Sequence, residues 1–231
     1  MIKAVFFDFY NTIARFWPPR EETQIVAARE FGLNPDADGL IRGYNEADRY
    51  MTEQNSRLHI QKMSPEDRLA FFVEYERRIL KGASIDVPLE VARKVWEKVR
   101  EQRYELALFD DALSTLKELK RRVLTVGLVS NIYRDLDELC SRLGITSYLD
   151  FKVTSMSAGA EKPHAKIFLA ALAAAKVEAS EAIHVGDQYG GDVVGARNVG
   201  IRPILLDRDG LNAHHTDVEQ IRSLPEVLAL V

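Results

Sequence analysis

The sequence predicts an α/β protein: an open, doubly wound parallel sheet with a smaller helical domain inserted after the first strand. Two observations lead to this fold class. Short apolar runs typical of strands alternate with helical patterns in the second half of the chain, which is the order of parallel βαβ units. Residues 14 to about 106, in contrast, contain no convincing strand and several stretches with apolar residues at three- and four-residue spacing. The expected domains are therefore a core formed by residues 1–14 and 107–231, and a helical insertion formed by residues 15–106.

The predicted strands are apolar along almost their whole length, as expected for strands that helices cover on both faces. The first contains one charged residue, Lys3, and runs directly into Asp8. An isolated carboxylate at the end of a buried strand is costly unless another group holds its charge, so Asp8 requires a partner. The predicted strands are residues 2–7, 122–130, 151–155, 182–187 and 202–207.

Helical patterns fill the insertion. Ser64 with Pro65, and Val87 with Pro88, are expected helix starts that place proline at the first helical position. Residues 210–231 are expected to form a loop and a last short helix that closes the core. The helical stretches of the insertion are residues 22–32, 40–55, 64–82 and 88–104.

Composition narrows the possible partners and the compartment. The 31 Lys and Arg residues are interspersed with 35 Asp and Glu residues, and the formal net charge is -4, which argues against a nucleic-acid surface. No apolar run reaches membrane-spanning length and no secretion signal opens the sequence, so no membrane contact is expected. Cys140 is expected to pack in a helix. Because it is the single cysteine, no internal disulfide can form, and this indicates a cytoplasmic protein.

Polar side chains follow the ends of the predicted strands. In an open α/β sheet the ligand crevice lies outside the carboxyl ends of the strands, so these side chains are expected to converge at one edge of the sheet. They are, in chain order, Asp8, Ser130, Asn131, Lys162, Asp187 and Asp192.

Three of these groups are carboxylates, and clustered like charges need a cation to coexist. Mg²⁺ bound to carboxylate and carbonyl oxygens would supply it, and would also neutralise an anionic substrate such as a phosphate. We expect Asp8 to attack phosphorus and form an aspartyl phosphate. Lys162 would balance the charge of nucleophile and substrate, while Ser130 and backbone N–H groups near Thr12 would bind the phosphoryl oxygens.

Four segments resemble, in order, the motifs of the haloacid dehalogenase-like (HAD) superfamily of hydrolases. They are FFDFYNT (6–12), LVSN (128–131), KPHAKIF (162–168) and HVGDQYGGDVVGARNVG (184–200). The resemblance covers the whole chain. It implies a Rossmann-like core, a C1-type helical cap inserted after the first motif, and a small-molecule anionic substrate. We expect the protein to act as a monomer or homodimer.

The resemblance also implies a role for each matching residue. Asp8 would be the nucleophile, Ser130 the phosphate-binding hydroxyl and Lys162 the charge-balancing lysine. The implied Mg²⁺ ligands are Asp8, Asp187, Asp192 and the backbone carbonyl of Tyr10. The implied substrate-binding residues are Tyr10, Asn11, Thr12 and Asn131.

Tyr10 departs from the phosphatase pattern of the superfamily. Phosphatases usually have a second aspartate there, which protonates the leaving group and then activates water, and they usually have glycine at the position of Asn11. Tyrosine at this position is what the 2-haloacid dehalogenases show, and their halide leaving group needs no proton. Two alternatives to Mg²⁺-dependent hydrolysis or transfer of a phosphoryl group therefore stay open: metal-independent 2-haloacid dehalogenation, and a binding protein with little hydrolytic turnover.

The last motif favours the phosphatase. Residues 186–192, GDQYGGD, keep the acidic pair of the Mg²⁺-dependent members, whereas the dehalogenases work without metal and have serine and asparagine in this motif. The dehalogenases also have a tyrosine where this chain has Phe168, and a cap arginine for which the chain offers both Arg42 and Arg49. His184 lies in a buried strand and is expected to be a core histidine hydrogen-bonded to backbone.

Overall fold

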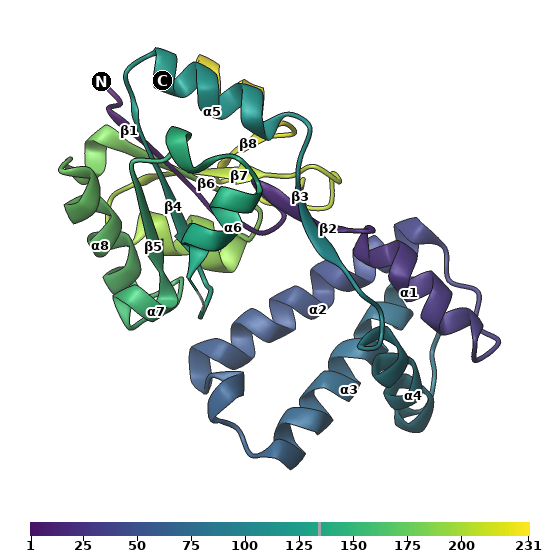
Figure 1. Cartoon of the computed structure of the whole chain (residues 1–231). Helices are drawn as coiled ribbons and strands as arrows, with labels where there is room; N and C mark the ends of the chain where they lie inside the picture. The colour runs from purple at the N-terminus through teal and green to yellow at the C-terminus, as the bar shows by residue number, and fades with distance from the viewer. Residues whose placement is uncertain (134) are drawn as a thin grey trace. The chain divides into compact units, whose positions relative to one another are not determined.

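The computed structural model describes residues 1–133 and 135–231 and divides the chain into two compact units (Figure 1). The core unit consists of Met1–Arg15 and Leu106–Val231, and the inserted unit consists of Phe16–Glu105. Two short strands, β2 (Ala14–Trp17) and β3 (Glu105–Leu108), connect the units and pair with each other in a two-stranded sheet. The expectation of no strand between residues 14 and 106 is therefore wrong at both ends. These strands are only four residues long and, apart from Ala14, exposed or only partly buried, so neither stands out in the sequence as a buried strand.

The core unit is built on a six-stranded sheet in which every pair is parallel. The strand order is β5-β4-β1-β6-β7-β8, so the chain winds in both directions from the central strand β1. The predicted fold class is confirmed. This order creates a switch point beside β1, where ligands bind in open α/β sheets. The strands are β1 (Ala4–Phe7), β4 (Thr125–Ser130), β5 (Phe151–Thr154), β6 (Ala182–Gly186), β7 (Arg202–Leu206) and β8 (Glu219–Ile221).

Helices cover both faces of the sheet. Along β1 the side chains alternate, so that Val5 and Phe7 belong to one apolar cluster while Ala4 and Phe6 belong to another. Both clusters are fully buried along this strand, which explains why its sequence is apolar at every position rather than at every second one. Figure 1 shows α5 and α8 on opposite faces of the sheet. The helices of this unit are α5 (Ala112–Arg121), α6 (Leu136–Arg142), α7 (Ser155–Ala158), α8 (Ala165–Ala175) and α9 (Val194–Arg197).

The C-terminal tail and several short helical turns complete the core unit. The tail forms β8 before it forms the expected short helix, which is a 3₁₀ helix, Leu224–Ala229. β8 was not predicted because it has only three residues, Glu-Gln-Ile, of which one is buried. Cys140 is fully buried in α6, in agreement with a packing role. The other short turns are two 3₁₀ helices, Thr146–Tyr148 and Ala179–Glu181, and a π-helical turn, Tyr189–Val193.

The inserted unit is helical, as predicted. Ser64 accepts a hydrogen bond from the backbone N–H of Asp67 and Pro65 is the first helical residue, which is the expected start of α3. α4 begins one residue later than expected, with Pro88 at the N-cap, where its missing N–H also costs nothing. The helices are α1 (Arg20–Arg29), α2 (Ala37–Arg57), a 3₁₀ turn (Ile60–Lys62), α3 (Pro65–Gly82) and α4 (Leu89–Val99).

Glycines allow α2 and α3 to pack backbone against backbone. A Cβ atom on Gly82 would lie 2.3 Å from the Cα of Gly43, and one on Gly43 would lie 2.1 Å from the carbonyl oxygen of Ile79. Any side chain at either position would therefore force the helices apart. No helix in the described parts of the chain is both long and apolar enough to span a membrane.

The inserted unit also buries polar side chains between its helices. Gln24 and Glu76 are almost fully buried, and the Gln24 amide donates a hydrogen bond to the Glu76 carboxyl. The Tyr44 hydroxyl donates to Gln24 Oε1 at 3.0 Å, and the Arg20 guanidinium lies over the Tyr44 ring at 4.1 Å. Burial raises the pKa of Glu76 to about 8, so its carboxyl is mainly protonated at neutral pH.

Candidate active site

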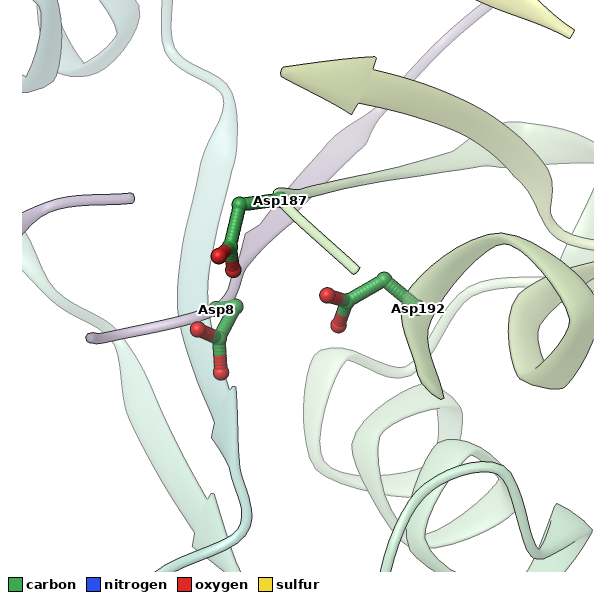
Figure 2. Close-up of side chains that lie close together, drawn as sticks. All are labelled: Asp8, Asp187 and Asp192. Carbon is green, nitrogen blue, oxygen red and sulfur yellow. The ribbon is translucent and has the colours of Figure 1, made fainter. Parts of the chain in front are cut away.

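The predicted convergence of side chains occurs at the carboxyl ends of β1 and β6. Asp8 follows β1, while Asp187 and Asp192 follow β6. One carboxylate oxygen from each lies within 4.8 Å of the others. Figure 2 shows Asp187 next to Asp8, with the Asp192 carboxylate directed toward both. The sheet order places these residues together, because β1 and β6 are neighbouring parallel strands.

Lys162 is the cation of this cluster. Its Nζ lies 2.5 Å from Asp8 Oδ1 and 2.6 Å from Asp192 Oδ1, and all three side chains are at least nine-tenths buried. A lysine that donates to two carboxylates in a low-dielectric site compensates much of their charge. Lys162 is thus the residue that allows acidic groups to be buried side by side.

The charges of the cluster are reflected in its pKa values. Burial raises the pKa of Asp8 and, with the nearby charge of Asp192, outweighs the lowering effect of Lys162. Burial also opposes ionisation of Asp192, but Lys162 and His184 hold its pKa below the usual range. For Lys162, the charges of Asp192 and Asp8 outweigh burial and raise its pKa above the usual value. Lys162 and Asp192 therefore form an ion pair at neutral pH.

Asn131 fixes the backbone that carries Lys162. Its side-chain oxygen accepts a hydrogen bond from the Lys162 backbone N–H at 2.7 Å, and its side-chain nitrogen donates to the Lys162 carbonyl at 3.1 Å. Asn131 was predicted to bind substrate, and the structure places its amide on the Lys162 backbone. Ser130, the residue before it, is buried at the end of β4. The second motif therefore connects the end of β4 to the lysine of the third.

The segment after Asp8 is a tight turn with internal hydrogen bonds. The Phe9 carbonyl accepts from the backbone N–H groups of Ile13, at 3.0 Å, and Ala14, at 2.9 Å. The Asn11 N–H donates to the Ala14 carbonyl at 2.7 Å. Asn11 has φ 57°, in the left-handed region where asparagine is one of the few residues besides glycine that is tolerated. Asparagine can therefore replace glycine at this position without changing the turn.

Tyr10 and Thr12 occupy this turn in different ways. Tyr10 is partly buried, and its ring packs edge to face on the Phe9 ring at a centroid distance of 5.2 Å. Thr12 is fully buried, and its Oγ1 has no hydrogen-bond partner among the residues that the structure describes. A buried hydroxyl without a partner costs free energy, so this atom is available to an acceptor from a ligand.

The π-helical turn after β6 positions Asp192. The turn begins two residues after Asp187, and Asp192 Oδ2 accepts from the backbone N–H of Gln188 at 3.0 Å. Gly186 makes this possible, since a Cβ atom there would lie 2.2 Å from Cγ of Asp192. A π-helical turn is common at functional sites and brings Asp192 back over the end of β6.

His184 belongs to the site, and sequence reasoning missed this. Its Nε2 lies 2.8 Å from Asp192 Oδ1, so the expectation that it bonds to backbone is wrong. Its ring also packs edge to face against Phe168 at 5.1 Å. His184 lies in β6 and Asp192 in the turn that follows it, so no single period of strand or helix relates the two residues. The contact depends on the π-helical turn, which left no signal in the sequence.

The donor set suits Mg²⁺. Asp8, Asp187 and Asp192 offer hard carboxylate oxygens at close range, which are the ligands that this ion prefers. Lys162 brings one positive charge to Asp8 and Asp192, so a further positive charge would improve the electrostatic balance of three carboxylates at this distance. The residues that are present therefore fit a divalent cation.

Comparisons with known proteins agree with this geometry. A family model described as haloacid dehalogenase-like hydrolase matches residues 2–200. The chain is 31% identical to the glyceraldehyde 3-phosphate phosphatase of Methanothermobacter thermautotrophicus over 95% of its own length and 92% of the relative. It is 28% identical to the ribulose-1,5-bisphosphate 5-phosphatase of Halopiger xanaduensis, over 90% of this chain and 85% of the relative.

Solved structures extend the likeness. A HAD phosphatase from Thermococcus onnurineus has a TM-score of 0.58 and 26% identity, over 99% of this chain and 97% of that one. A 2-haloacid dehalogenase from Pseudomonas syringae pv. Tomato has a TM-score of 0.58 and 25% identity, over 100% of this chain and 98% of that one. The family model describes a hydrolase, and two of the relatives above are phosphatases. On the strength of the family match over most of its length, the chain belongs to the haloacid dehalogenase-like hydrolases.

Proposed function

We propose that this protein hydrolyses, or transfers, the phosphoryl group of a small phosphorylated metabolite, with Asp8 as the nucleophile and Mg²⁺ as the cofactor. The observation that carries the proposal is the buried cluster in which Lys162 bridges Asp8 and Asp192 beside Asp187. A phosphatase needs an anionic nucleophile that can approach an anionic substrate, and this cluster supplies the compensating charge.

The chemistry has two steps. In the first, a carboxylate oxygen of Asp8 attacks phosphorus, the bond from phosphorus to the leaving oxygen breaks, and Asp8 becomes an acyl phosphate. In the second, water attacks phosphorus, inorganic phosphate leaves and the Asp8 carboxylate is regenerated. When bound to Asp8, Asp187 and Asp192, Mg²⁺ would neutralise charge on the transferring group.

The other residues of the cluster bind and orient. Lys162 compensates the charge shared by Asp8 and the phosphoryl group. The buried hydroxyls of Ser130 and Thr12 would donate to phosphoryl oxygens, which would give Thr12 Oγ1 its missing partner. Asn131 and His184 hold Lys162 and Asp192 in place.

Tyr10 limits the range of substrates. Tyr10 stands where the phosphatases have their aspartate, and a phenol is a weaker acid than a carboxyl group for protonating the leaving oxygen. Leaving groups that are stable as anions need no such proton. We therefore propose a preference for activated phosphates, such as acyl or aryl phosphates, over alkyl phosphates.

A second candidate is 2-haloacid dehalogenation, which Tyr10 favours. In that reaction Asp8 would displace halide from carbon and water would hydrolyse the resulting ester. Two contacts disfavour it. Phe168 takes the place of the dehalogenase tyrosine and is fully buried against His184 without a hydroxyl group. Of the two candidate cap arginines, Arg49 is paired with Glu46 and Arg42 donates to the Gly82 carbonyl.

A paired assay separates the two candidates. p-Nitrophenyl phosphate is offered with and without Mg²⁺, and L-2-chloropropionate is offered with chloride release as the readout, each to wild type and Asp8→Asn. Mg²⁺-dependent phosphate release that the variant lacks is the expected result. Chloride release without metal would replace the proposal by the second candidate. If phosphate release is found, Tyr10→Asp tests the missing acid, and the readout is hydrolysis of alkyl phosphates.

A further inference from the structure

Arg208 lies outside the residues matched by the family model, yet it contacts the turn that follows the nucleophile. Its Nη2 donates to the Thr12 carbonyl at 3.1 Å. The same side chain makes a two-pronged pair with Asp111, with Nη1 to Oδ2 and Nη2 to Oδ1 both at 2.9 Å. Both side chains are about four-fifths buried, so this pair is shielded from solvent far more than an ordinary surface pair.

The surroundings of Arg208 join four segments of the core unit. Its guanidinium lies over the Phe109 ring at 4.0 Å, and the Phe109 N–H donates to the Ile13 carbonyl at 3.1 Å. Asp111 Oδ2 also accepts from the Leu224 N–H at 3.0 Å. The contacts therefore tie the turn after β1 to the segment before α5 and to the C-terminal tail.

We propose that Arg208 is a positioning residue for the turn formed by residues 9–14, and that through this turn it sets the orientation of Asp8. The catalytic part of this inference rests on the function proposed above. The turn's own hydrogen bonds close it at its ends, through the Phe9 and Ala14 carbonyls, and from outside the Phe109 N–H reaches only the Ile13 carbonyl among the turn's carbonyls described above. Thr12 lies between them, and Arg208 holds its carbonyl from the side.

The geometry requires arginine rather than lysine. One guanidinium can donate to both oxygens of Asp111 and to the Thr12 carbonyl while its plane covers the Phe109 ring. A lysine is a point charge on a flexible stem and could keep the pair with Asp111, but not all of these contacts together. The Arg208→Lys variant thus separates stability of the fold from positioning of the turn.

Hydrogen exchange tests the positioning directly and needs no activity. In Arg208→Ala we expect the amides of Asn11, Ile13 and Ala14 to exchange about tenfold faster or more, the size expected from one lost charge-assisted hydrogen bond. The control is Arg202→Ala, which removes an exposed Arg–Glu pair from the same C-terminal region and touches no residue of the turn. Unchanged exchange of the turn in Arg208→Ala, relative to this control, would overturn the inference.

Arg208→Lys keeps the test decisive if Arg208→Ala does not fold. We expect a melting temperature near that of wild type, faster exchange in the turn, and kcat for p-nitrophenyl phosphate lowered about tenfold with little change in KM. A purely structural role predicts the opposite: lower melting temperature with unchanged exchange and unchanged kcat per folded molecule. If wild type itself releases no phosphate, the proposed function fails, and the exchange measurement still decides the role of Arg208.

Discussion

The two units of this protein both bury carboxyl groups, and they do so in different ways. In the core unit Asp8 and Asp192 share the ammonium group of Lys162, and the pKa of Asp192 is held below its usual range. In the inserted unit Glu76 has an amide, Gln24, as its hydrogen-bond partner, and burial raises the pKa of Glu76 to about 8. Pairing with Lys162 keeps Asp192 ionised and partly offsets the effect of burial on Asp8, whose pKa is raised, whereas the inserted unit avoids charge on Glu76 by keeping a proton.

This difference distinguishes a site for chemistry from a polar contact that serves packing. A nucleophilic carboxylate must be ionised at the pH of the reaction, which requires a cation beside it. A protonated glutamic acid between helices can satisfy hydrogen bonds and fix how the helices pack, but it cannot act as an anion. Whether a buried acid of this chain is ionised therefore depends on its partners and not on burial alone.

The largest expected effect comes from replacing Asp8, the proposed nucleophile. Asp8→Asn should lower kcat for p-nitrophenyl phosphate by about a thousandfold or more, because the amide cannot form the acyl phosphate. The matched change in the inserted unit, Glu76→Gln, should leave kcat within about threefold, since it replaces a mainly neutral group by a neutral one. Similar losses of kcat in both variants would contradict the distinction between the buried carboxyl groups of the two units.

Removing the shared cation should destabilise the core unit strongly. Lys162→Met leaves two buried carboxylates without their partner, and we expect the free energy of unfolding in urea to fall by about 3–5 kcal/mol. Lys3→Met is the control, because Lys3 pairs with Glu181 at an exposed site where solvent screens the charges. A loss as small as that of the control would mean that the buried carboxylates are not held by Lys162.

The inserted unit should lose stability as pH rises. The pKa of Glu76 is about 8 in the folded state and near its ordinary value of 4.5 when unfolded. Between these values the unfolded chain releases a proton that the folded chain keeps, so unfolding becomes easier by a few kcal/mol from about pH 4.5 to about pH 8. Glu76→Gln should flatten this dependence in urea unfolding followed by tryptophan fluorescence.

Glu74, on the same helix, provides a control of opposite sign. Its hydrogen bond with Arg77 lowers the pKa of Glu74, and Arg78 adds to this. Its contribution to stability is thus present above the unfolded pKa and lost as pH falls. Glu74→Gln should remove a small loss of stability at low pH and leave the loss of stability between about pH 4.5 and pH 8 intact. The reverse pattern would contradict the assignment of the second loss to Glu76.

The smallest effects are expected at two left-handed backbone positions, one in each unit. Asn11 in the core unit has φ 57°, and Ser84 in the inserted unit has φ 59°. Ser84→Gly should raise the free energy of unfolding by about 0.5–1 kcal/mol, because serine is less tolerated in this region than asparagine. Asn11→Gly should change it by only a few tenths of a kcal/mol. Equal gains at both positions, measured by urea unfolding, would show that the asparagine is strained as well.

The sequence was informative wherever one short segment determines one element. The core strands are continuous apolar runs, and the ends of β1 and β6 revealed Asp8 and Asp187, because a charge there is conspicuous. Contacts that combine distant segments were not predictable. His184 meets Asp192 only through a π-helical turn, and Arg208 reaches the Thr12 carbonyl across 196 positions of sequence. Neither contact follows from local periodicity, because each depends on the tertiary arrangement.

The pairing of β2 with β3 has a consequence for how this architecture can change. The chain leaves the sheet and returns to it on two adjacent strands, so the ninety residues of the inserted unit, Phe16–Glu105, begin and end side by side. An insertion attached in this way can be lengthened, shortened or exchanged without altering the register of the strands of the six-stranded sheet.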